Sequence, residues 1–455
     1  MMRPYQRWIA RSLSVLAMSV MALPASAQLG GIGLPSAPSI AGRPLEGFPD
    51  LPRTPPRPNV RAPSLPTAAP TLPPVGGLAT LRSTQVQALI RDHADVIDVD
   101  DQGQAVVRSE VVALSPSPQS LAIASKAGFR IGEETPLDGL GLSTVTLRPP
   151  AGVSVREAVR RLKALDPQGQ YDFNHIYLGA GAVNARPSRP AAGGHGAGVR
   201  IGLVDGGVSA HPSLGPVEQR GFAPGGLKVS AHATAVASLM TGRADRFRGA
   251  APGARLLVAD VYGGSPTGGS AVIIAQALAW MAQSKVPVIN VSLVGPPNLT
   301  LRAAVAALVA RGHLVVAAVG NDGPAAPPLY PAAYPGVVSV TGVDAQRKVL
   351  PEAGRGGHVD FAAPGADMAG ASNQGGYVAL RGTSFAAPLV AGRLALALPS
   401  PDTGDASRAV AALARDARDL GARGPDAVYG KGLVAFDLRT SPVAVGAGRA
   451  LLAGQ

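Results

Sequence analysis

Short apolar runs alternate with longer runs of helical spacing along the second half of the chain, and this alternation constrains the fold most. The apolar runs begin at residues 199, 255, 286 and 314. Helical spacing follows residue 234 and covers residues 270–284, 301–311, 384–398 and 406–420. Strands that alternate with helices in this way form a parallel sheet covered on both faces. We therefore predict an α/β fold of this kind over residues 199–440.

Length and composition narrow the classes of function. The 455 residues exceed the ~250 at which one core stops growing, so more than one folded unit is expected. The absence of cysteine excludes disulfides, thiol nucleophiles and cysteine-bound zinc. The formal charge is +12, but the basic residues form no run of five or six, so we expect no nucleic-acid partner.

The first residues have the pattern of a secretion signal. Arg3, Arg7 and Arg11 precede an apolar run over residues 13–23, and the small residues 25–27 follow. A membrane anchor is the alternative, but the run is shorter than the ~20 residues that cross a bilayer. We expect a signal peptide at residues 1–27, export to the periplasm or beyond, and no membrane span in the mature protein.

Composition divides the remaining chain. Residues 28–78 are rich in proline, which predicts a disordered linker. Residues 79–180 combine extended runs (97–99, 105–114, 142–147 and 171–178) with two expected helices, the clearer of which begins with a capping box at Ser154. We expect a small α+β unit here, then a Gly/Ala/Pro-rich joint at 181–198. A loose tail is expected at 441–455.

Three separated motifs carry chemistry. Asp205 follows the apolar run 199–204, at the edge where open α/β sheets bind ligands, although such an Asp is usually a turn former. His232 opens a helix, and a lone His is commonly structural, the role that we assign to His211. In the segment RGTSFAAP, Ser384 lies at a helix N-terminus, where unpaired N–H groups favour an oxyanion. A plain N-cap is the alternative for Ser384.

The order Asp, His, Ser with these surroundings resembles the subtilisin family of serine peptidases over residues 199–438, a family in which this order is well known. The resemblance implies that Asp205, His232 and Ser384 form a catalytic triad. Asn321, in the turn GNDG after an apolar strand, matches the asparagine of the family's oxyanion hole. The resemblance also implies a substrate held as an added strand, in pockets lined by Ser292, Leu293, Val294, Ala317, Ala318 and Val319.

The same resemblance implies an endopeptidase whose chemistry needs no metal or organic cofactor. Structural calcium is common in the family, but no ligand set can be assigned here. The partners expected are protein or peptide substrates and the small unit itself. That unit resembles the family's inhibitory prodomain, and we expect self-cleavage near residues 179–198. An unrelated accessory domain is the alternative.

Some residues depart from the family pattern. Ala233 and Ala235 follow His232 where glycine and histidine are usual, Gly206 replaces a serine or threonine, and Val294 replaces a glycine. The bulkier Val294 predicts a narrower pocket. Because the residues next to Asp205 and His232 differ from the family pattern, a catalytically silent protein that uses the same fold for binding is an alternative. A processing protease for one exported partner, tethered by the Pro-rich linker, is a further alternative.

Overall fold

A computed structural model describes residues 77–183 and 198–447. The predicted signal peptide, the Pro-rich linker up to residue 76, residues 184–197 of the joint and residues 448–455 of the tail lie outside this part. We call residues 77–175 the small unit, residues 176–183 the connecting segment and residues 198–447 the large unit. Within the described ranges, no helix is long and apolar enough to cross a membrane.

The large unit is built on a seven-stranded sheet with the strand order β17-β16-β15-β13-β8-β12-β9. Every neighbouring pair is parallel. The strands are β8 (Arg200–Asp205), β9 (Val217–Gly221), β12 (Arg255–Asp260), β13 (Val288–Val291), β15 (Leu314–Ala318), β16 (Val338–Val343) and β17 (Phe361–Pro364). The sequence predicted the four central strands, which are almost wholly buried.

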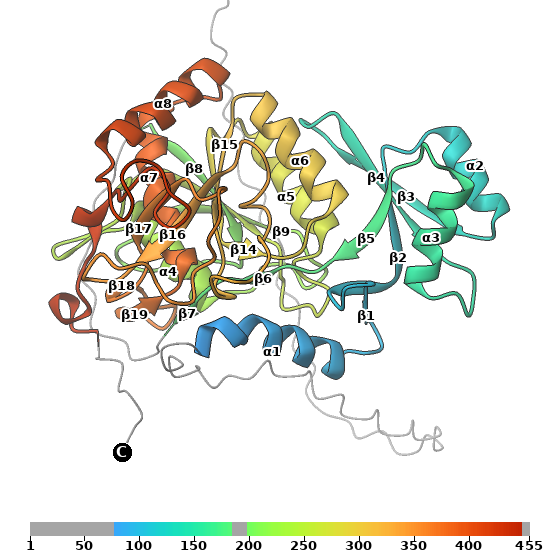
Figure 1. Ribbon diagram of the computed structural model, residues 1–455, viewed down its shortest axis with the longest axis horizontal. Helices are drawn as coiled ribbons and strands as arrows, with labels where there is room; N and C mark the ends of the chain where they lie inside the picture. The colour runs from blue at the N-terminus through green and yellow to red at the C-terminus, as the bar shows by residue number, and fades with distance from the viewer. Residues whose placement is uncertain (1–76, 184–197, 448–455) are drawn as a thin grey trace, which may run out of the picture. The chain divides into compact units, whose positions relative to one another are not determined.

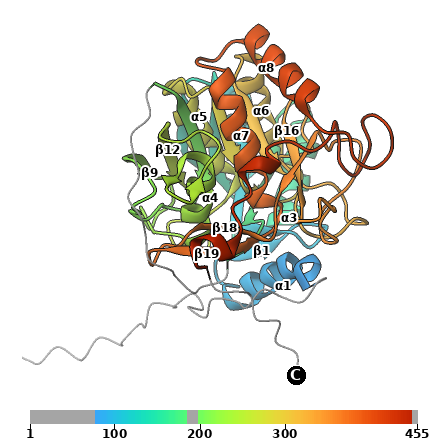
Figure 2. The ribbon, with the colours of Figure 1, turned by 90° about the vertical axis from the view of Figure 1, so that its left-hand side faces the viewer.

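Helices cover both faces of this sheet, which confirms the predicted fold class (Figures 1 and 2). One apolar core lies under α4 (Ala231–Thr241) and α7 (Ala387–Ala397). The other lies under α5 (Ala271–Gln283) and α6 (Leu299–Ala310). Both layers are rich in alanine, which lets the helices approach the sheet closely.

Several predicted boundaries are wrong by a few residues. The last helix, α8 (Thr403–Asp416), begins before residue 406 because Asp402 caps it and accepts the Asp405 N–H at 2.8 Å. The helix predicted from residue 384 is a 3₁₀ turn, η1 (Thr383–Phe385), followed by α7. Near the C-terminus, Pro442–Val445 form a further 3₁₀ turn, η3, and the loose tail expected at 441–455 stays a prediction because residues 448–455 lie outside the described part.

Short strands complete the large unit. A hairpin of β18 (Met368–Ala371) and β19 (Tyr377–Arg381) leads directly into η1. The pair β10 (Arg243–Ala244) and β11 (Phe247–Arg248) follows α4, and β14 (Leu293–Val294) follows β13. The turn η2 (Phe436–Leu438) lies near the end of the described chain.

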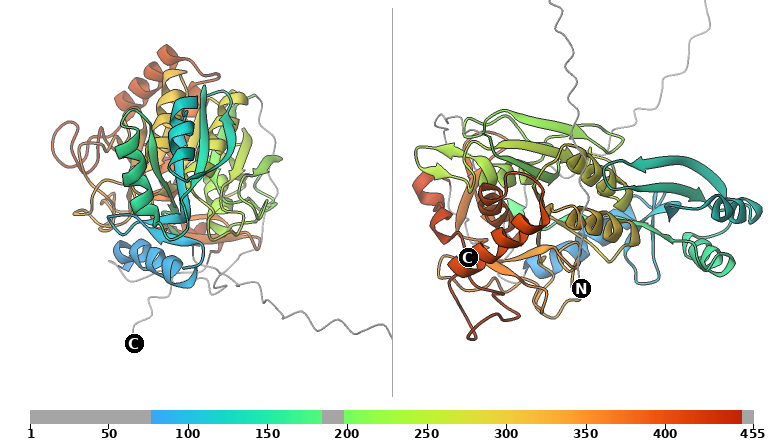
Figure 3. Two further views of the ribbon diagram at one scale, coloured as in Figure 1. Left: turned by 90° about the vertical axis from the view of Figure 1, so that its right-hand side faces the viewer. Right: turned by 90° about the horizontal axis from the view of Figure 1, so that it is seen from above.

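The small unit has an antiparallel sheet with two helices, α2 (Pro118–Lys126) and α3 (Val155–Leu165), packed on it (Figure 3). Its strands are β1 (Ile97–Val99), β2 (Ala105–Leu114), β3 (Arg130–Leu137), β4 (Leu142–Arg148) and β5 (Tyr171–His175). The Oγ of Ser154 accepts the Glu157 N–H at 3.2 Å, as the capping box predicted. Helix α1 (Gly77–Asp92), which precedes the sheet, was not predicted.

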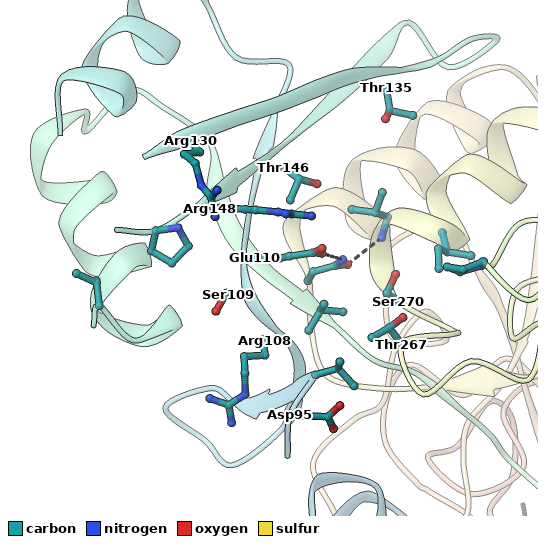
Figure 4. Close-up of a pocket in the computed structure, with 18 of the residues that line it drawn as sticks. Asp95, Arg108, Ser109, Glu110, Arg130, Thr135, Thr146, Arg148, Thr267 and Ser270 are labelled. Atoms are coloured by element: carbon teal, nitrogen blue, oxygen red, sulfur yellow. Dashed lines mark hydrogen bonds between the residues drawn. The ribbon is translucent and has the colours of Figure 1, made fainter. Parts of the chain in front are cut away.

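Strand β5 joins the two units by capping helices of the large unit. Asn174 Oδ1 accepts the Val272 N–H of α5 at 3.2 Å, and Asp172 Oδ2 accepts the Leu299 N–H of α6 at 2.7 Å. Ser270, the N-cap residue of α5, makes no side-chain cap of its own. An open pocket of about 1130 Å³ beside this contact is lined from both units, with Glu110 and Arg148 opposite Ser270 (Figure 4).

Candidate active site

Asp205, His232 and Ser384 lie in one line of hydrogen bonds at the carboxyl edge of the sheet. His232 Nδ1 is 2.8 Å from Asp205 Oδ2, and His232 Nε2 is 2.9 Å from Ser384 Oγ. An ionised carboxylate can only accept, so the imidazole proton lies on Nδ1 and Nε2 can accept the serine hydroxyl hydrogen. This geometry suits removal of a proton from Ser384.

The elements that carry Asp205 and His232 hold them firmly. Asp205 ends β8, is 2% exposed, and accepts the Gly206 N–H at 2.7 Å through Oδ1. His232 lies in the first turn of α4, which Ser230 caps. A Cβ on Gly206 would lie 2.6 Å from the Ser230 Cβ. Packing therefore accounts for the glycine at position 206.

Ser384 lies in η1, at the start of the turn that leads into α7. Gly382 just before it has φ 138°, a conformation that favours glycine. A Cβ there would also lie 3.0 Å from the Ala180 carbonyl oxygen. Ser292 follows β13 directly, and its Oγ donates a hydrogen bond to the Ser384 carbonyl oxygen at 3.0 Å. This bond holds the turn that carries Ser384 in place.

Asn321, the residue predicted for an oxyanion hole, shares a hydrogen-bond acceptor with Ser384. Its Nδ2 donates to the Ala180 carbonyl oxygen at 2.8 Å, and the Ser384 N–H donates to the same oxygen at 3.2 Å. Asn321 Oδ1 accepts the Thr383 N–H at 3.1 Å, which orients the amide. One carbonyl of the connecting segment thus receives two donors of the kind that stabilise an oxyanion.

The connecting segment runs through a groove of the large unit as an added strand. Its β6 (Leu178–Gly179) pairs antiparallel with β14, so that Gly179 faces Leu293 and Leu178 faces Val294. The Ala180 N–H donates to the Ser292 carbonyl at 3.3 Å. Beyond Gly181, β7 (Ala182–Val183) pairs with β19. Ser292, Leu293 and Val294 therefore border the connecting segment, and their contact with a substrate stays a prediction.

The other three residues expected at the pockets lie deeper. Ala317 and Ala318 end β15 and contribute to the apolar cores on the two faces of the sheet. The Val319 N–H donates to the Val340 carbonyl at 3.1 Å. Contact of these three residues with substrate stays a prediction.

Several residues at the groove escaped the sequence analysis. Leu329 packs with Ala180 and Val294 in a small buried cluster, and Phe385 lies next to Ser384. The Tyr177 N–H donates to the Gly269 carbonyl at 2.9 Å, which makes residue 269 a second edge of the groove. Arg82 of α1 donates to Asp322 Oδ2 at 2.6 Å, beside Asn321. Phe385 belongs to the motif RGTSFAAP, but the motif does not show what its ring contacts, and Leu329, Gly269 and Arg82 belong to no local motif.

Other ionisable groups near the site serve packing. His211 is buried, with ring nitrogens 2.7 Å from Ser213 Oγ and 2.8 Å from the Gly376 carbonyl, in keeping with a structural role. Burial lowers the pKa of His211 and outweighs the hydrogen bond to the Gly376 carbonyl. Among residues 77–183 and 198–447, no group of three or more His, Asp or Glu side chains could hold a metal ion.

The parallel sheet, with a hydroxyl, an imidazole and a carboxylate aligned at its carboxyl edge, defines the class of the protein as a serine peptidase. The model of the subtilase family matches residues 196–432, just over half the chain. The chain belongs to the subtilase family and is a subtilisin-like serine endopeptidase.

Named relatives agree with this membership. Subtilisin Savinase of Lederbergia lenta is 34% identical over 56% of this chain and 97% of its own length. Subtilisin E of Bacillus subtilis (strain 168) is 31% identical over 61% of this chain and 77% of its own. Among solved structures, fervidolysin from Fervidobacterium pennivorans, a keratinolytic enzyme related to subtilisin, superposes with a TM-score of 0.62 at 20% identity. That match covers 78% of this chain and 63% of fervidolysin.

Proposed function

We propose that Asp205, His232 and Ser384 are the catalytic triad of an exported endopeptidase, and that the protein cuts its own chain between Ala180 and Gly181. One observation carries the proposal. The Ala180 carbonyl oxygen lies 2.8 Å from Asn321 Nδ2 and 3.2 Å from the Ser384 nitrogen, while the three triad side chains form one hydrogen-bonded line. A peptide bond in that position is the substrate of the reaction.

The residues supply each step of the cleavage. Ser384 Oγ forms a bond to the Ala180 carbonyl carbon as His232 Nε2 takes the hydroxyl proton, and Asp205 stabilises the imidazolium. The negative charge on the Ala180 oxygen is held by Asn321 Nδ2 and the Ser384 N–H. His232 then gives its proton to the Gly181 nitrogen, the peptide bond breaks, and an ester joins Ala180 to Ser384.

Water completes the reaction. His232 removes a proton from the attacking water, which adds to the ester carbon, and the proton returns to Ser384 Oγ as the ester breaks. The products are an N-terminal fragment that ends in the Ala180 carboxylate and a C-terminal fragment that begins at Gly181 and contains the large unit. The fragment keeps its strand pairing in the groove, so we propose that it inhibits the enzyme until it leaves. No cofactor takes part.

Export is supported by the N-terminal sequence alone. The basic residues, the apolar run and the small residues before Gln28 fit a cleavable signal, so the exported chain should begin at Gln28. N-terminal sequencing of the uncut Ser384→Ala protein from the periplasm or medium tests this part independently of self-cleavage. A chain that stays cytoplasmic or begins at Met1 would contradict it.

The full chain tests the catalytic part. Wild-type protein should yield a fragment whose first residue is Gly181, and a fluorophosphonate should label Ser384. The variant Ser384→Ala should stay intact and unlabelled, whereas Ser372→Ala, which changes another buried serine of the large unit, should process normally. Processing of the folded Ser384→Ala protein at the same bond would overturn self-cleavage. A folded wild-type protein that resists the label would favour the silent binding protein.

A further inference from the structure

The side chain of Ala180 is buried against two apolar side chains of the large unit. Ala180 is 5% exposed, and it forms one buried cluster with Val294, which is 1% exposed, and Leu329, which is 7% exposed. A larger side chain before the cut would have to displace one of them.

The walls of this pocket are fixed by the backbone. Val294 lies in β14, paired with Leu178. The next residue, Gly295, exchanges two hydrogen bonds of 3.0 Å with Tyr330, so the segments that carry Val294 and Leu329 are tied together. Leu329 also rests on the main chain before Asn321, because a Cβ on Gly320 would lie 2.5 Å from the Leu329 Cδ1. Overpacking such a site is costly.

The size of the residue after the cut, Gly181, is restricted by Ser384 and Phe385. A Cβ on Gly181 would lie 2.2 Å from Ser384 Oγ and 2.7 Å from the Phe385 Cε2. The serine hydroxyl can rotate. The Phe385 ring is wholly buried and packs against the His232 ring, with centroids 5.2 Å apart, so it has little room to move. Phe385 therefore acts as a wall against any side chain at this position.

Farther from the cut, a deep pocket holds Tyr177. Its side chain is fully buried, and its hydroxyl donates to the Pro296 carbonyl at 2.7 Å. Gly295 makes this possible, because a Cβ there would lie 2.5 Å from the Tyr177 Cδ1. Gly179, in contrast, has ordinary space, since its Cβ would lie 3.9 Å from the His232 ring. The anchoring residue is the tyrosine, and position 179 tolerates a side chain.

We propose that Val294, Leu329 and Phe385 restrict this protease to bonds between two small residues, alanine before the cut and glycine after it, in chains that also carry a tyrosine at the position equivalent to Tyr177. The substrate class is therefore a protein segment of the form Tyr-x-x-Ala-Gly. The inference rests on the proposed function, because it takes Ala180–Gly181 as the bond in the active site.

Quenched fluorescent peptides with the sequence of residues 176–183 test the restriction on self-processed wild-type enzyme, with active sites counted by fluorophosphonate titration. Replacing the alanine before the cut by phenylalanine should lower kcat/KM at least about 100-fold, and replacing the glycine after it by leucine should do the same. Replacing the tyrosine by alanine should lower kcat/KM about tenfold or more.

Variants of the enzyme test whether Val294, Leu329 and Phe385 cause the restriction to small residues. Leu329→Ala and Val294→Ala should each lower the preference for alanine over phenylalanine about tenfold, and Phe385→Met should selectively improve the peptide with leucine after the cut. Leu433→Ala, which shortens a buried leucine of a separate cluster, should leave every ratio unchanged. The ratios are independent of the amount of folded enzyme, so a loss of stability in one variant does not obscure them.

The outcomes separate the two proposals. An enzyme that titrates with fluorophosphonate but cleaves the phenylalanine peptide as fast as the alanine peptide overturns the specificity and leaves the triad intact. Unchanged ratios in both Leu329→Ala and Val294→Ala would overturn the role of these walls. A folded protein that neither titrates nor cleaves any peptide contradicts the proposed function itself.

Discussion

The small unit and the large unit bury their sheets to different degrees. Strands β13, β15 and β16 of the large unit are buried at every residue. Strand β3 of the small unit is exposed at most of its residues, and only Leu137 near its end is buried. The sheet of the large unit is therefore covered on both faces, whereas the small unit has a smaller apolar core of its own and leaves β3 exposed. The smaller core fits the role proposed above, in which the small unit inhibits the enzyme and leaves the large unit after cleavage.

Among the variants considered, Tyr177→Ala should change the free energy of opening of the small unit most, because the Tyr177 side chain is the most deeply buried anchor of the connecting segment. Removal of a buried aromatic side chain costs about 3–5 kcal/mol. In uncut Ser384→Ala protein, hydrogen exchange should show opening of the small unit favoured by about this amount, while β15 keeps its protection.

The matched control is Tyr177→Phe, which removes only the hydroxyl and its bond to Pro296. That change should cost about 1 kcal/mol. Equal loss of protection in β15 and in the small unit would show that the units open together and would break the comparison.

The caps supplied by β5 should have the next largest effect. Asp172→Ala and Asn174→Ala each remove one cap from a different helix, at about 1 kcal/mol each, and the two losses should add. The free energy of opening of the small unit, measured by hydrogen exchange, reports them. Asp138→Ala, at an exposed aspartate of the same unit, serves as the control and should change nothing.

A smaller effect is expected from Arg82→Ala, which breaks the pair between α1 and Asp322. Both side chains are mostly buried, at 16% and 14% exposure, so the loss should be about 1 kcal/mol and confined to exchange in α1. Arg91→Ala in the same helix removes a pair whose arginine is 71% exposed and should have no measurable effect. Similar effects of the two variants would argue against a specific role for Arg82.

As the pH falls, the large unit should begin to lose stability at a higher pH than the small unit. Burial lowers the pKa of His313 and His358, as it does for His211. A buried histidine with a lowered pKa favours the neutral form in the folded state, so stability falls as the pH drops below the unfolded value of about 6.5.

In the small unit, burial alone would raise the pKa of Asp100, but hydrogen bonds from His175 and from backbone N–H groups outweigh it and lower this pKa. The stability that this carboxylate contributes is present above about pH 4 and lost only as the pH falls through the lowered pKa. Exchange in Ser384→Ala protein between pH 6.5 and 4.5 should therefore show losses in β15 and not in β2. The reverse order would be the contradicting result.

Local signals account for what the sequence predicted. The central strands are continuous apolar runs, which neighbours along the chain reveal. Each residue of the proposed triad lies in a short motif, but the order of the three motifs and their resemblance to the subtilisin family were needed to select them. Strand β9 was missed because Val217–Gly221 is a short segment at an edge of the sheet whose three central residues are all polar. Helix α1 was missed because it begins inside the segment whose proline content predicted a linker.

The walls of the pocket could not be predicted in the same way. Leu329 reaches Ala180 only because Gly295 and Tyr330 bond across two distant segments. The Val294 departure did point to a narrow pocket, and its pairing with Leu178 shows that it borders the connecting segment. The role of Phe385 as a wall depends on where Gly181 lies, which no local pattern encodes.

The passage of the connecting segment through the groove has a consequence for competition. While the chain is continuous, this segment is presented to the groove at an effective concentration of order millimolar or higher, which a foreign peptide at micromolar concentration cannot match. After a single cut, occupancy of the groove depends on an ordinary binding equilibrium between the N-terminal fragment and the rest of the protein. Dilution into a larger volume then becomes the signal that opens the groove.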